Sequence, residues 1–549
     1  MTNFTTPVVV NAGNNNYVLN AADTLAVSDD DAITWEGANT NITVTIDGSI
    51  TSVADNSFAI SGSTPPTGHL DFNVSSGGSV NAEFDARDLG AGATITVNNN
   101  GLFNGSADHA MRFAENGGAV TLNNNATGVM TTEDAGEDVL KDGSNTIINN
   151  RGKIISAGDQ FNADGTPSKT GGDAIDFGDG TGNTINNFAG AVIAASHHGI
   201  TGDHGGTINN DEGAQIIGHN GSGINFDNDP DPANLVTVKN AGVIMGESQT
   251  YADSDGDAID CDGSVSVENH GFIGGMGANG QHDGGDNHSE AFAIGGGTVK
   301  NFADGTIFSV QRGFQVDDSA EGDAPAALVL TNAGIIQASN GWEAIKIVGS
   351  QDDKITNSGT IIGDIVTGGG DDTVTLKAGS SIKGEIQLGD GNDTLTAVEG
   401  KLNVNAGTGD DTVKGGSAAD TINGSDGIDK IYGRGGADKL TGGAAADTFV
   451  FALADTGNTT KTADTILDFN VAQKDVLDLS SIDANSMKSK DQAFIFIGSA
   501  DFHHKAGELR FDQVKGDTFV YGDLDGNGKS DFMIHLDGSI ALKAGSFDL

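Results

Sequence analysis

An aspartate recurs at every ninth residue of the segment GGSAADTINGSDGIDKIYGRGGADKLTGGAAADTF, residues 415–449. Each aspartate follows small residues, mostly glycine, and precedes an apolar residue by two positions. The repeating unit is therefore a turn plus a very short strand. Glycines allow positive φ and a bare backbone, so the turn can aim carbonyl oxygens inward while the aspartate adds a carboxylate. An oxygen-only site of this kind suits a hard cation, and calcium in particular.

The same frame continues upstream as "QLGDGNDTL" and "NAGTGDDTV", although Leu402 stands where the unit between them should have an acid. "TGGGDDTVT" is a further copy, three residues out of frame. These internal repeats match the calcium-binding nonapeptide, and the apolar position points into a thin core between two stacked sheets. The predicted metal ligands are Asp372, Asp393, Asp411, Asp420, Asp429, Asp438, Asp447, Gly391, Gly409, Gly427 and Gly436.

On these nonads, residues 367–450 resemble the RTX (repeats-in-toxin) family. The resemblance implies a parallel β-roll with two nonads per turn, in which ions lie between loops eighteen residues apart. It implies that one edge carries Asp393, Asp411, Asp429 and Asp447, and the other Asp420 and Asp438. The chain departs from the pattern where glycine is replaced by Ala418, Ser425, Arg434 and Ala445.

The segment after the nonads is similar to the terminal segment of type I secreted proteins such as the serralysin-type proteases. The matching stretches are "ADTILDF" at 463–469 and "KDVLDLS" at 474–480. Over residues 447–549 the resemblance implies a cap on the roll, an uncleaved C-terminal signal recognised by a type I ABC exporter, and a Gram-negative bacterial source. No "HExxH" motif occurs, so the zinc-protease half of that family is not expected.

Within this segment, "GDLDGNGKSDF" spaces four residues like the first part of a calcium loop. They are Asp523, Asp525, Asn527 and Asp531. The acid expected at the twelfth position is missing, because Ile534 stands there. A calcium site and a plain Asx-rich turn between strands are both open interpretations.

Residues 71–366 also repeat, with an asparagine recurring at steps of 23 to 37 residues: Asn124, Asn150, Asn187, Asn210, Asn240, Asn269, Asn301, Asn332 and Asn357. Each unit has three short apolar alternations between Gly/Asn/Asp turns and no helical period. The pattern predicts a parallel β-helix, with the asparagines stacked into a structural amide ladder. The expected all-β chain has an N-terminal cap or assembly arm (1–70), a parallel β-helix (71–366), the RTX β-roll (367–450) and a C-terminal capping and secretion-signal domain (451–549). Degenerate units at 40–52 and 93–103 suggest that the solenoid begins before residue 70.

The 549 residues carry a formal charge of −50, from 27 basic and 77 acidic residues. Such a field repels nucleic acids and anionic membranes, so neither is an expected partner. Calcium would offset part of this charge, and metal binding is expected to trigger folding. A single cysteine, Cys261, excludes an intramolecular disulfide. The sequence shows no Sec signal peptide and no apolar run long enough for a spanning helix, so no membrane insertion is expected.

Four other groups are candidates for chemistry. Two acidic clusters, Asp173, Asp176 and Asp179, and Asp253, Asp255, Asp257, Asp260 and Asp262, could be paired glycosidase carboxylates, but turn acids or further calcium sites are favoured. His197 and His198, with His204 nearby, favour a surface pair over a metal site, because adjacent residues of a strand point to opposite faces. Cys261, flanked by acids, is expected to have a raised thiol pKa and to be a poor nucleophile.

In layout the chain resembles secreted mannuronan C5-epimerases and related polyuronate lyases. Those enzymes need a tyrosine or histidine for proton transfer and basic side chains for the uronate carboxylate. Outside the calcium and tail regions the chain has only Tyr17 and Tyr251, and its arginines there, Arg87, Arg112, Arg151 and Arg312, fall in separate coils. No catalytic residue is assigned, and an enzyme is the less favoured interpretation.

The chain also resembles bacterial S-layer proteins of the RTX type, in its β-solenoid, nonads and C-terminal export signal. The favoured hypothesis is a secreted, calcium-dependent structural protein on the surface of a Gram-negative bacterium. It would self-assemble as a homo-oligomer or polymer, an S-layer-like lattice or filament, with a cell-surface polysaccharide as a possible partner. The alternatives are a polyuronate-modifying enzyme and a glycan-binding adhesin.

Overall fold

The computed structural model describes residues 2–27, 31–36, 40–52, 58–62, 68–87, 92–105, 109–113, 118–132, 136–156, 171–247, 256–277, 289–317, 324–339, 341–485 and 487–549. It contains two compact units: an N-terminal unit, Met1–Ala326 with Ile336–Trp342, and a C-terminal unit, Ala327–Ile335 with Glu343–Leu549. In the described ranges the only helical elements are two 3-10 turns, η1 (Pro232–Asn234) and η2 (Ala544–Ser546). None of the described helices is long and apolar enough to cross a membrane. The expected all-β class is confirmed.

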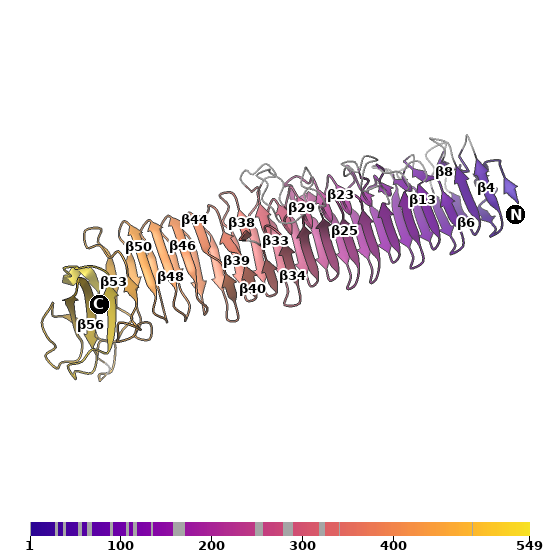
Figure 1. Cartoon of the computed structure of the whole chain (residues 1–549). Helices are drawn as coiled ribbons and strands as arrows, with labels where there is room; N and C mark the ends of the chain where they lie inside the picture. The colour runs from indigo at the N-terminus through magenta and orange to yellow at the C-terminus, as the bar shows by residue number, and fades with distance from the viewer. Residues whose placement is uncertain are drawn as a thin grey trace, which may run out of the picture. The chain divides into compact units, whose positions relative to one another are not determined.

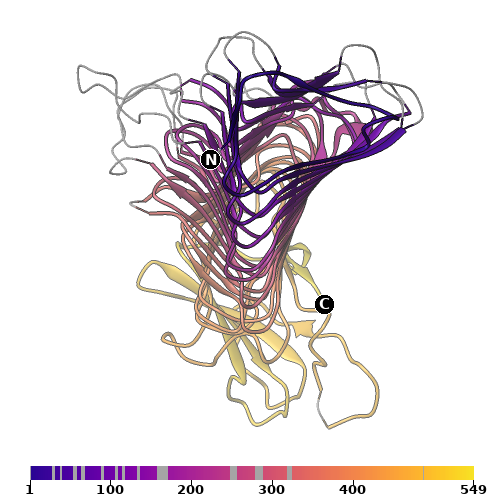
Figure 2. The same ribbon diagram turned by 90° about the vertical axis from the view of Figure 1, so that its right-hand side faces the viewer.

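The N-terminal unit is a stack of coils, each of which adds one strand to each of three parallel sheets (Figure 1). In a typical coil, β21 (Asn183–Asn187), β22 (Val192–Ala195) and β23 (Ile200–Gly202) pair with β24 (Gly206–Asn210), β25 (Gln215–Gly218) and β26 (Ile224–Phe226) of the next. Figure 2 looks along this stack and shows the indigo and magenta coils enclosing a common interior. This is the parallel β-helix predicted from the repeats.

Strands of all three sheets already occur within residues 1–70, where a cap or an assembly arm was expected. β1 (Asn3–Phe4), β2 (Val8–Val10) and β3 (Asn16–Leu19) pair in parallel with β4 (Thr24–Val27), β5 (Ile33–Trp35) and β6 (Thr40–Ile46). The solenoid therefore includes the first described strands of the chain.

Alternating side chains of each strand fill the interior of the N-terminal unit. In one coil Ile185, Ile193 and Ile200 are at most 1% exposed, and each stands in register with an isoleucine of the next coil. Because side chains alternate across a strand, the intervening polar residues face outward. Stacking of like residues on like residues gives the coil its continuous core.

The recurring asparagines form a buried amide ladder, as predicted. Nδ2 of one asparagine donates to Oδ1 of the asparagine in the following coil, at 2.8 Å from Asn124 to Asn150, 2.9 Å from Asn187 to Asn210 and 2.8 Å from Asn210 to Asn240. In the C-terminal unit Asn332 donates to Asn357 at 2.7 Å. The ladder satisfies polar groups that the turn buries, so its role is structural.

Replacing Asn210 with alanine is expected to loosen the coils on either side of it. The change removes one of the two acceptors of Asn187 Nδ2 and the donor to Asn240 and to the Val243 carbonyl, at a cost of about 1–3 kcal/mol. The measurement is hydrogen exchange of residues 183–240. Asn209→Ala is the matched control, because Asn209 is only partly buried in a second amide ladder, and equal loss of protection in both variants would contradict the assigned role.

In the C-terminal unit the third sheet ends with β43 (Ser381–Lys383), which pairs with β40 (Thr360–Ile362). From there each coil has two strands: β44 (Ile386–Asp390), β45 (Thr394–Ala397), β46 (Asn403–Thr408), β47 (Thr412–Lys414), β48 (Thr421–Asp426), β49 (Lys430–Tyr432), β50 (Lys439–Ala444) and β51 (Thr448–Val450). Paired residues such as Val413 and Ile431 are eighteen positions apart, and their side chains are fully buried. A nonad holds one turn and one short strand, so the coils narrow into the β-roll that was predicted.

The last coil of the roll is closed by a small antiparallel sheet. β52 (Thr465–Ile466) and β53 (Val476–Asp478) extend the two sheets of the roll. β55 (Glu508–Val514), β56 (Asp517–Asp523) and β57 (Phe532–Leu536) form an antiparallel meander, and β57 pairs with β52. β58 (Phe547–Asp548) pairs with β53. The roll's terminal strands are thereby paired, and an open β-edge is avoided there.

Candidate metal centre

The aspartates of the nonads form two columns in the C-terminal unit. In each column a carboxylate Oδ1 accepts the backbone N–H of the aspartate one coil earlier, at 2.7 Å from Asp393 to Asp411, 2.9 Å from Asp411 to Asp429 and 2.8 Å from Asp420 to Asp438. The first column is Asp353, Asp372, Asp393, Asp411, Asp429, Asp447 and Asp475. The second column is Asp420, Asp438 and Asp464. This is the division between two edges that the resemblance to the RTX family implied.

The second oxygen of most of these carboxylates has no hydrogen-bond partner although it is buried. The unpaired Oδ2 atoms are those of Asp353, Asp372, Asp393, Asp411, Asp429, Asp438, Asp447 and Asp464. Burial raises the pKa of Asp393 and Asp429 to about 6 and that of Asp411 and Asp447 to about 7, against the opposing effect of the N–H group that each accepts. A buried carboxylate is costly unless a cation or a proton offsets its charge.

In three nonads the unpaired oxygen faces a glycine at the first position of its own nonad. A Cβ atom placed on Gly424 would lie 2.2 Å from Oδ2 of Asp429 and 2.6 Å from the carbonyl oxygen of Gly442, one coil later. A Cβ on Gly433 would lie 2.5 Å from Oδ2 of Asp438, and one on Gly442 2.3 Å from Oδ2 of Asp447. In these nonads a carboxylate oxygen and a backbone carbonyl thus converge on a spot beside the bare Cα of a glycine.

These spots fit calcium. Their donors are all oxygen atoms, carboxylate and carbonyl, which is the donor set that a hard divalent cation takes. The aspartates of both columns, with the carbonyl groups of the first residue of neighbouring nonads, would hold the ions. Bound calcium would supply the positive charge that the buried Oδ2 atoms lack.

The predicted turn glycines have the backbone conformation that the nonad needs. Gly391, Gly409, Gly427 and Gly436 have φ values of 134°, 122°, 145° and 147°. A Cβ on Gly427 would lie 1.7 Å from the carbonyl oxygen of Gly409, so any side chain there would push neighbouring coils apart. Ser425 and Ala445 keep positive φ values of 77° and 84° in spite of their side chains.

Three aspartates of the columns were missed in the sequence. Asp353, Asp464 and Asp475 precede the apolar residues Ile355, Ile466 and Leu477 by two positions, as in every nonad, but their separations from neighbouring column members are not multiples of nine. An aspartate two residues before an apolar residue is thus visible at all three positions in the sequence, but a search for a nine-residue period does not find it.

The loop after β56 brings together the other predicted ligands. Asp523, Asp525 and Asp531 offer carboxylate oxygens that all lie within 4.8 Å of one another. Asp523 accepts the N–H groups of Gly526 and Gly528 at 2.7 and 2.8 Å. Asn527 accepts that of Lys529 through its side chain at 2.8 Å. The loop has Asx-turn hydrogen bonds as well as a cluster of acids, so both interpretations of its sequence stand.

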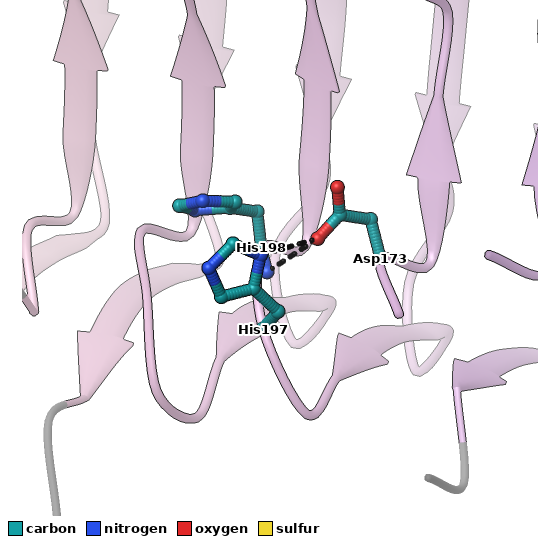
Figure 3. Close-up of side chains that lie close together, drawn as sticks. All are labelled: Asp173, His197 and His198. Atoms are coloured by element: carbon teal, nitrogen blue, oxygen red, sulfur yellow. Dashed lines mark hydrogen bonds and ion pairs between the residues drawn. The ribbon is translucent and has the colours of Figure 1, made fainter. Parts of the chain in front are cut away.

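A separate group in the N-terminal unit joins Asp173, His197 and His198 (Figure 3). Oδ1 of Asp173 accepts from Nδ1 of His197 at 3.1 Å and from the backbone N–H of His198 at 2.8 Å. The prediction that the two histidines point to opposite faces is wrong, because they lie in the turn between β22 and β23 and their ring centroids are 3.7 Å apart. Burial lowers the pKa of His198 to about 3, and its Nδ1 accepts the Ser222 N–H.

The acids around this group have a basic partner in the same unit, Lys141. Asp138, Asp173 and Asp176 lie close together, and Lys141 pairs with both Asp138 and Asp176. Asp179, predicted near Asp173 and Asp176, lies beside Asp203, whose pKa is raised by burial and by this neighbour. The arrangement supports a structural role for the cluster.

Two members of the second acidic cluster, Asp253 and Asp255, lie outside the described residues. Tyr251, one of the two tyrosines considered for proton transfer, also lies outside them. Asp257 accepts the N–H of Glu290 at 2.5 Å. Cys261 is 1% exposed, and burial, with Asp260 and Asp262 beside it, raises its thiol pKa. The predicted direction of the thiol shift is confirmed, although burial is its main cause.

The C-terminal part of the chain matches a known protein family. Residues 343–547 match the family described as peptidase M10 serralysin C terminal. Among solved structures, the chain is similar to the AlgE6R3 subunit of the mannuronan C5-epimerase from Azotobacter vinelandii, with 21% identity over 26% of this chain and 78% of that chain and a TM-score of 0.13. No curated protein sequence matches the chain.

Proposed function

Residues 343–547 are a serralysin-type C-terminal RTX region, and from this premise we propose that the chain is a secreted, calcium-dependent structural protein of a bacterial cell surface. Such a region implies export by a type I ABC exporter. The proposed source is a Gram-negative bacterium, and the proposed assembly is an S-layer-like lattice or a filament of identical chains.

The observation that carries the proposal is the two columns of buried carboxylates with unpaired Oδ2 atoms. Without a cation these charges oppose one another inside the roll. Calcium sites of the extracellular type bind at about 10⁻⁴–10⁻³ M and would stay empty where calcium is kept low. Because metal binding and ordering are coupled, the roll is expected to fold after it has reached the outside.

Self-assembly is supported by the charge on the surface of the roll. Exposed acids recur on its turns at Asp371, Asp390, Asp410 and Asp426. With a formal charge of −50, two copies repel each other at low ionic strength. Divalent cations between such surfaces would remove the repulsion and allow edges to meet.

Negative-stain electron microscopy of the purified full chain at millimolar calcium, at equal magnesium and with excess chelator tests the assembly. Ordered sheets or filaments in calcium alone would support the proposal. Magnesium is the matched control, because it demands a smaller octahedral site and should not replace calcium in the roll. Dispersed particles in calcium would contradict self-assembly and favour a glycan-binding adhesin.

A second function is favoured by one pair of basic residues. Arg112 on β14 (Met111–Phe113) and Lys141 on β17 (Leu140–Lys141) are register partners in neighbouring coils. Arg112 Nε lies 3.9 Å from Glu83 and 3.8 Å from Asp142, and Lys141 pairs with Asp138 and Asp176. Adjacent basic side chains with carboxylates beside them are what a polyuronate-modifying enzyme would use.

Incubation with alginate and pectin, followed by NMR of the sugar residues, tests this second function. A change in uronate composition or chain length that is lost in Arg112→Gln and Lys141→Gln would establish it. Unchanged polymers would reject it and leave the Arg112 and Lys141 ion pairs a structural role.

A further inference from the structure

The nonad at residues 397–405 is the one copy between residues 388 and 450 that lacks the aspartate. The pairing of Thr396 with Lys414, and of Lys414 with Tyr432, stacks residues 397, 415 and 433 in successive coils. These are the first positions of the nonads that belong to the second column. In the first of them the chain has Ala397 in place of glycine and Leu402 in place of the aspartate.

The next coil shows what the missing site would look like. A Cβ on Gly415 would lie 2.6 Å from Oδ2 of Asp420 and 2.7 Å from the Gly433 carbonyl oxygen, the pattern found at Gly424. Residue 397 is an alanine, like residue 406 in the nonad of Asp411, so the departure that matters is Leu402, which is 3% exposed and supplies no carboxylate oxygen. The residues at this turn therefore do not fit a calcium ion.

A different cation reaches this turn. The guanidinium Nη1 of Arg434 donates to the carbonyl oxygen of Ala397, two coils earlier, and to that of Gly415 at 3.4 Å. These are first-position carbonyls, the kind of group that faces the metal spots elsewhere in the roll. An arginine side chain stays protonated and offers several fixed donors, so it can bind carbonyl groups without metal.

The backbone of Arg434 has a conformation that favours glycine. Its φ is 61°, in the left-handed region, where the second position of other nonads has Gly389, Gly407, Gly443 or Ser425. A residue with a side chain is costly in this conformation. Asp420 differs from its neighbours Asp411, Asp429 and Asp438, whose Oδ2 atoms are unpaired. Its own Oδ2 accepts the Gly416 N–H at 2.8 Å.

We propose that the guanidinium of Arg434 takes the place of a calcium ion at the turn formed by Ala397, Leu402 and Gly415. One turn of the roll is then held by a cation that belongs to the chain. Calcium is not needed to order this turn, and the chain binds fewer ions than its nonads would suggest. The inference rests on the calcium-binding roll of the proposed function.

The test compares four full-length proteins by bound calcium per chain, measured by equilibrium dialysis, and by melting temperature in saturating calcium. They are the unaltered chain, Arg434→Gly, Arg434→Gly combined with Ala397→Gly and Leu402→Asp, and Lys439→Ala. We expect Arg434→Gly to melt several degrees lower, with no recovery in further calcium. The triple variant should bind one more calcium ion per chain and regain the lost melting temperature.

Two features of the design isolate the guanidinium. Glycine suits the positive φ at position 434, so a loss of stability in Arg434→Gly cannot come from backbone strain. Lys439, which is exposed, gives the matched loss of one positive charge and should change neither quantity.

Either of two results would overturn the inference. An unchanged melting temperature in Arg434→Gly would show that the Arg434 side chain does not stabilise this turn. A triple variant with the calcium content of the unaltered chain would show that no cation position exists at this turn. If the unaltered chain binds no calcium at all, the proposed function fails instead, so the two failures are distinguishable.

Discussion

Removal of calcium at about pH 8 is expected to unfold the β-roll of the C-terminal unit and to leave the β-helix of the N-terminal unit folded. Chelation would leave two columns of buried, unpaired carboxylates in the roll. The roll's thin core, with one apolar residue per nonad, would contribute too little stability to offset the cost of burying these charges. The N-terminal unit has a three-sided apolar core and a neutral amide ladder that need no metal. Hydrogen exchange with mass spectrometry, in calcium and in chelator, resolves the two units in the full chain.

Replacement of Asp411 and Asp429 with asparagine should raise the calcium concentration needed for folding about tenfold, which corresponds to ~1.4 kcal/mol. An amide oxygen is a weaker ligand for calcium than a carboxylate oxygen. Asp410→Asn with Asp426→Asn is the matched control, because these neighbouring acids are exposed and their charges are screened by salt. An unchanged calcium midpoint in the first variant, or an equal shift in both, would count against the assigned ligands.

In chelator, lowering the pH from about 8 to about 5 is expected to stabilise the roll. The folded-state pKa values of the column aspartates are raised by burial above the ordinary value of 3.8, to about 6 for Asp393, about 7 for Asp411 and about 8 for Asp464. The folded roll therefore binds more protons than the unfolded chain between these values. This contribution is fully present below pH 3.8 and is lost as the pH rises through about 6 to 8.

Thermal melts followed by circular dichroism at pH 5, 6, 7 and 8 measure this dependence. Calcium should weaken or reverse it, because protons and calcium compete for the same oxygen atoms. Repulsion among all the acids of the chain also makes the folded state more stable at low pH. The double variant Asp411→Asn, Asp429→Asn separates the two effects. It should reduce the dependence of the melting temperature on pH more than the double variant Asp410→Asn, Asp426→Asn does. An apo roll that melts higher at pH 8 than at pH 5 would contradict the buried-carboxylate account.

Much of this structure could be predicted because its rules are local and repeat. The apolar position of each nonad fixes which side chains are inside, and Ile422, Ile431 and Leu440 are all fully buried as expected. The asparagine ladder was equally visible, since Asn187 and Asn210 end similar strands in successive coils.

The unpredicted features depend on which residues the coils bring together. Asp438 meets Asp464 across 26 residues and Arg112 meets Lys141 across 29, because insertions in the turns change coil length without changing register. His198 escaped prediction for another reason. Period-two alternation holds only within a strand, and this residue lies in a corner, where its backbone N–H donates to Asp173 and its ring accepts the Ser222 N–H.

The hydrogen bonds of the aspartate columns all run one way along the chain. Each carboxylate receives the N–H of the coil before it, and the last acceptors, Asp464 and Asp475, belong to the segment that closes the roll. The N–H groups of Asp438 and Asp447 are therefore paired only when the closing segment is in place. The closing segment thus completes the two aspartate columns, in addition to covering the last strands of the roll.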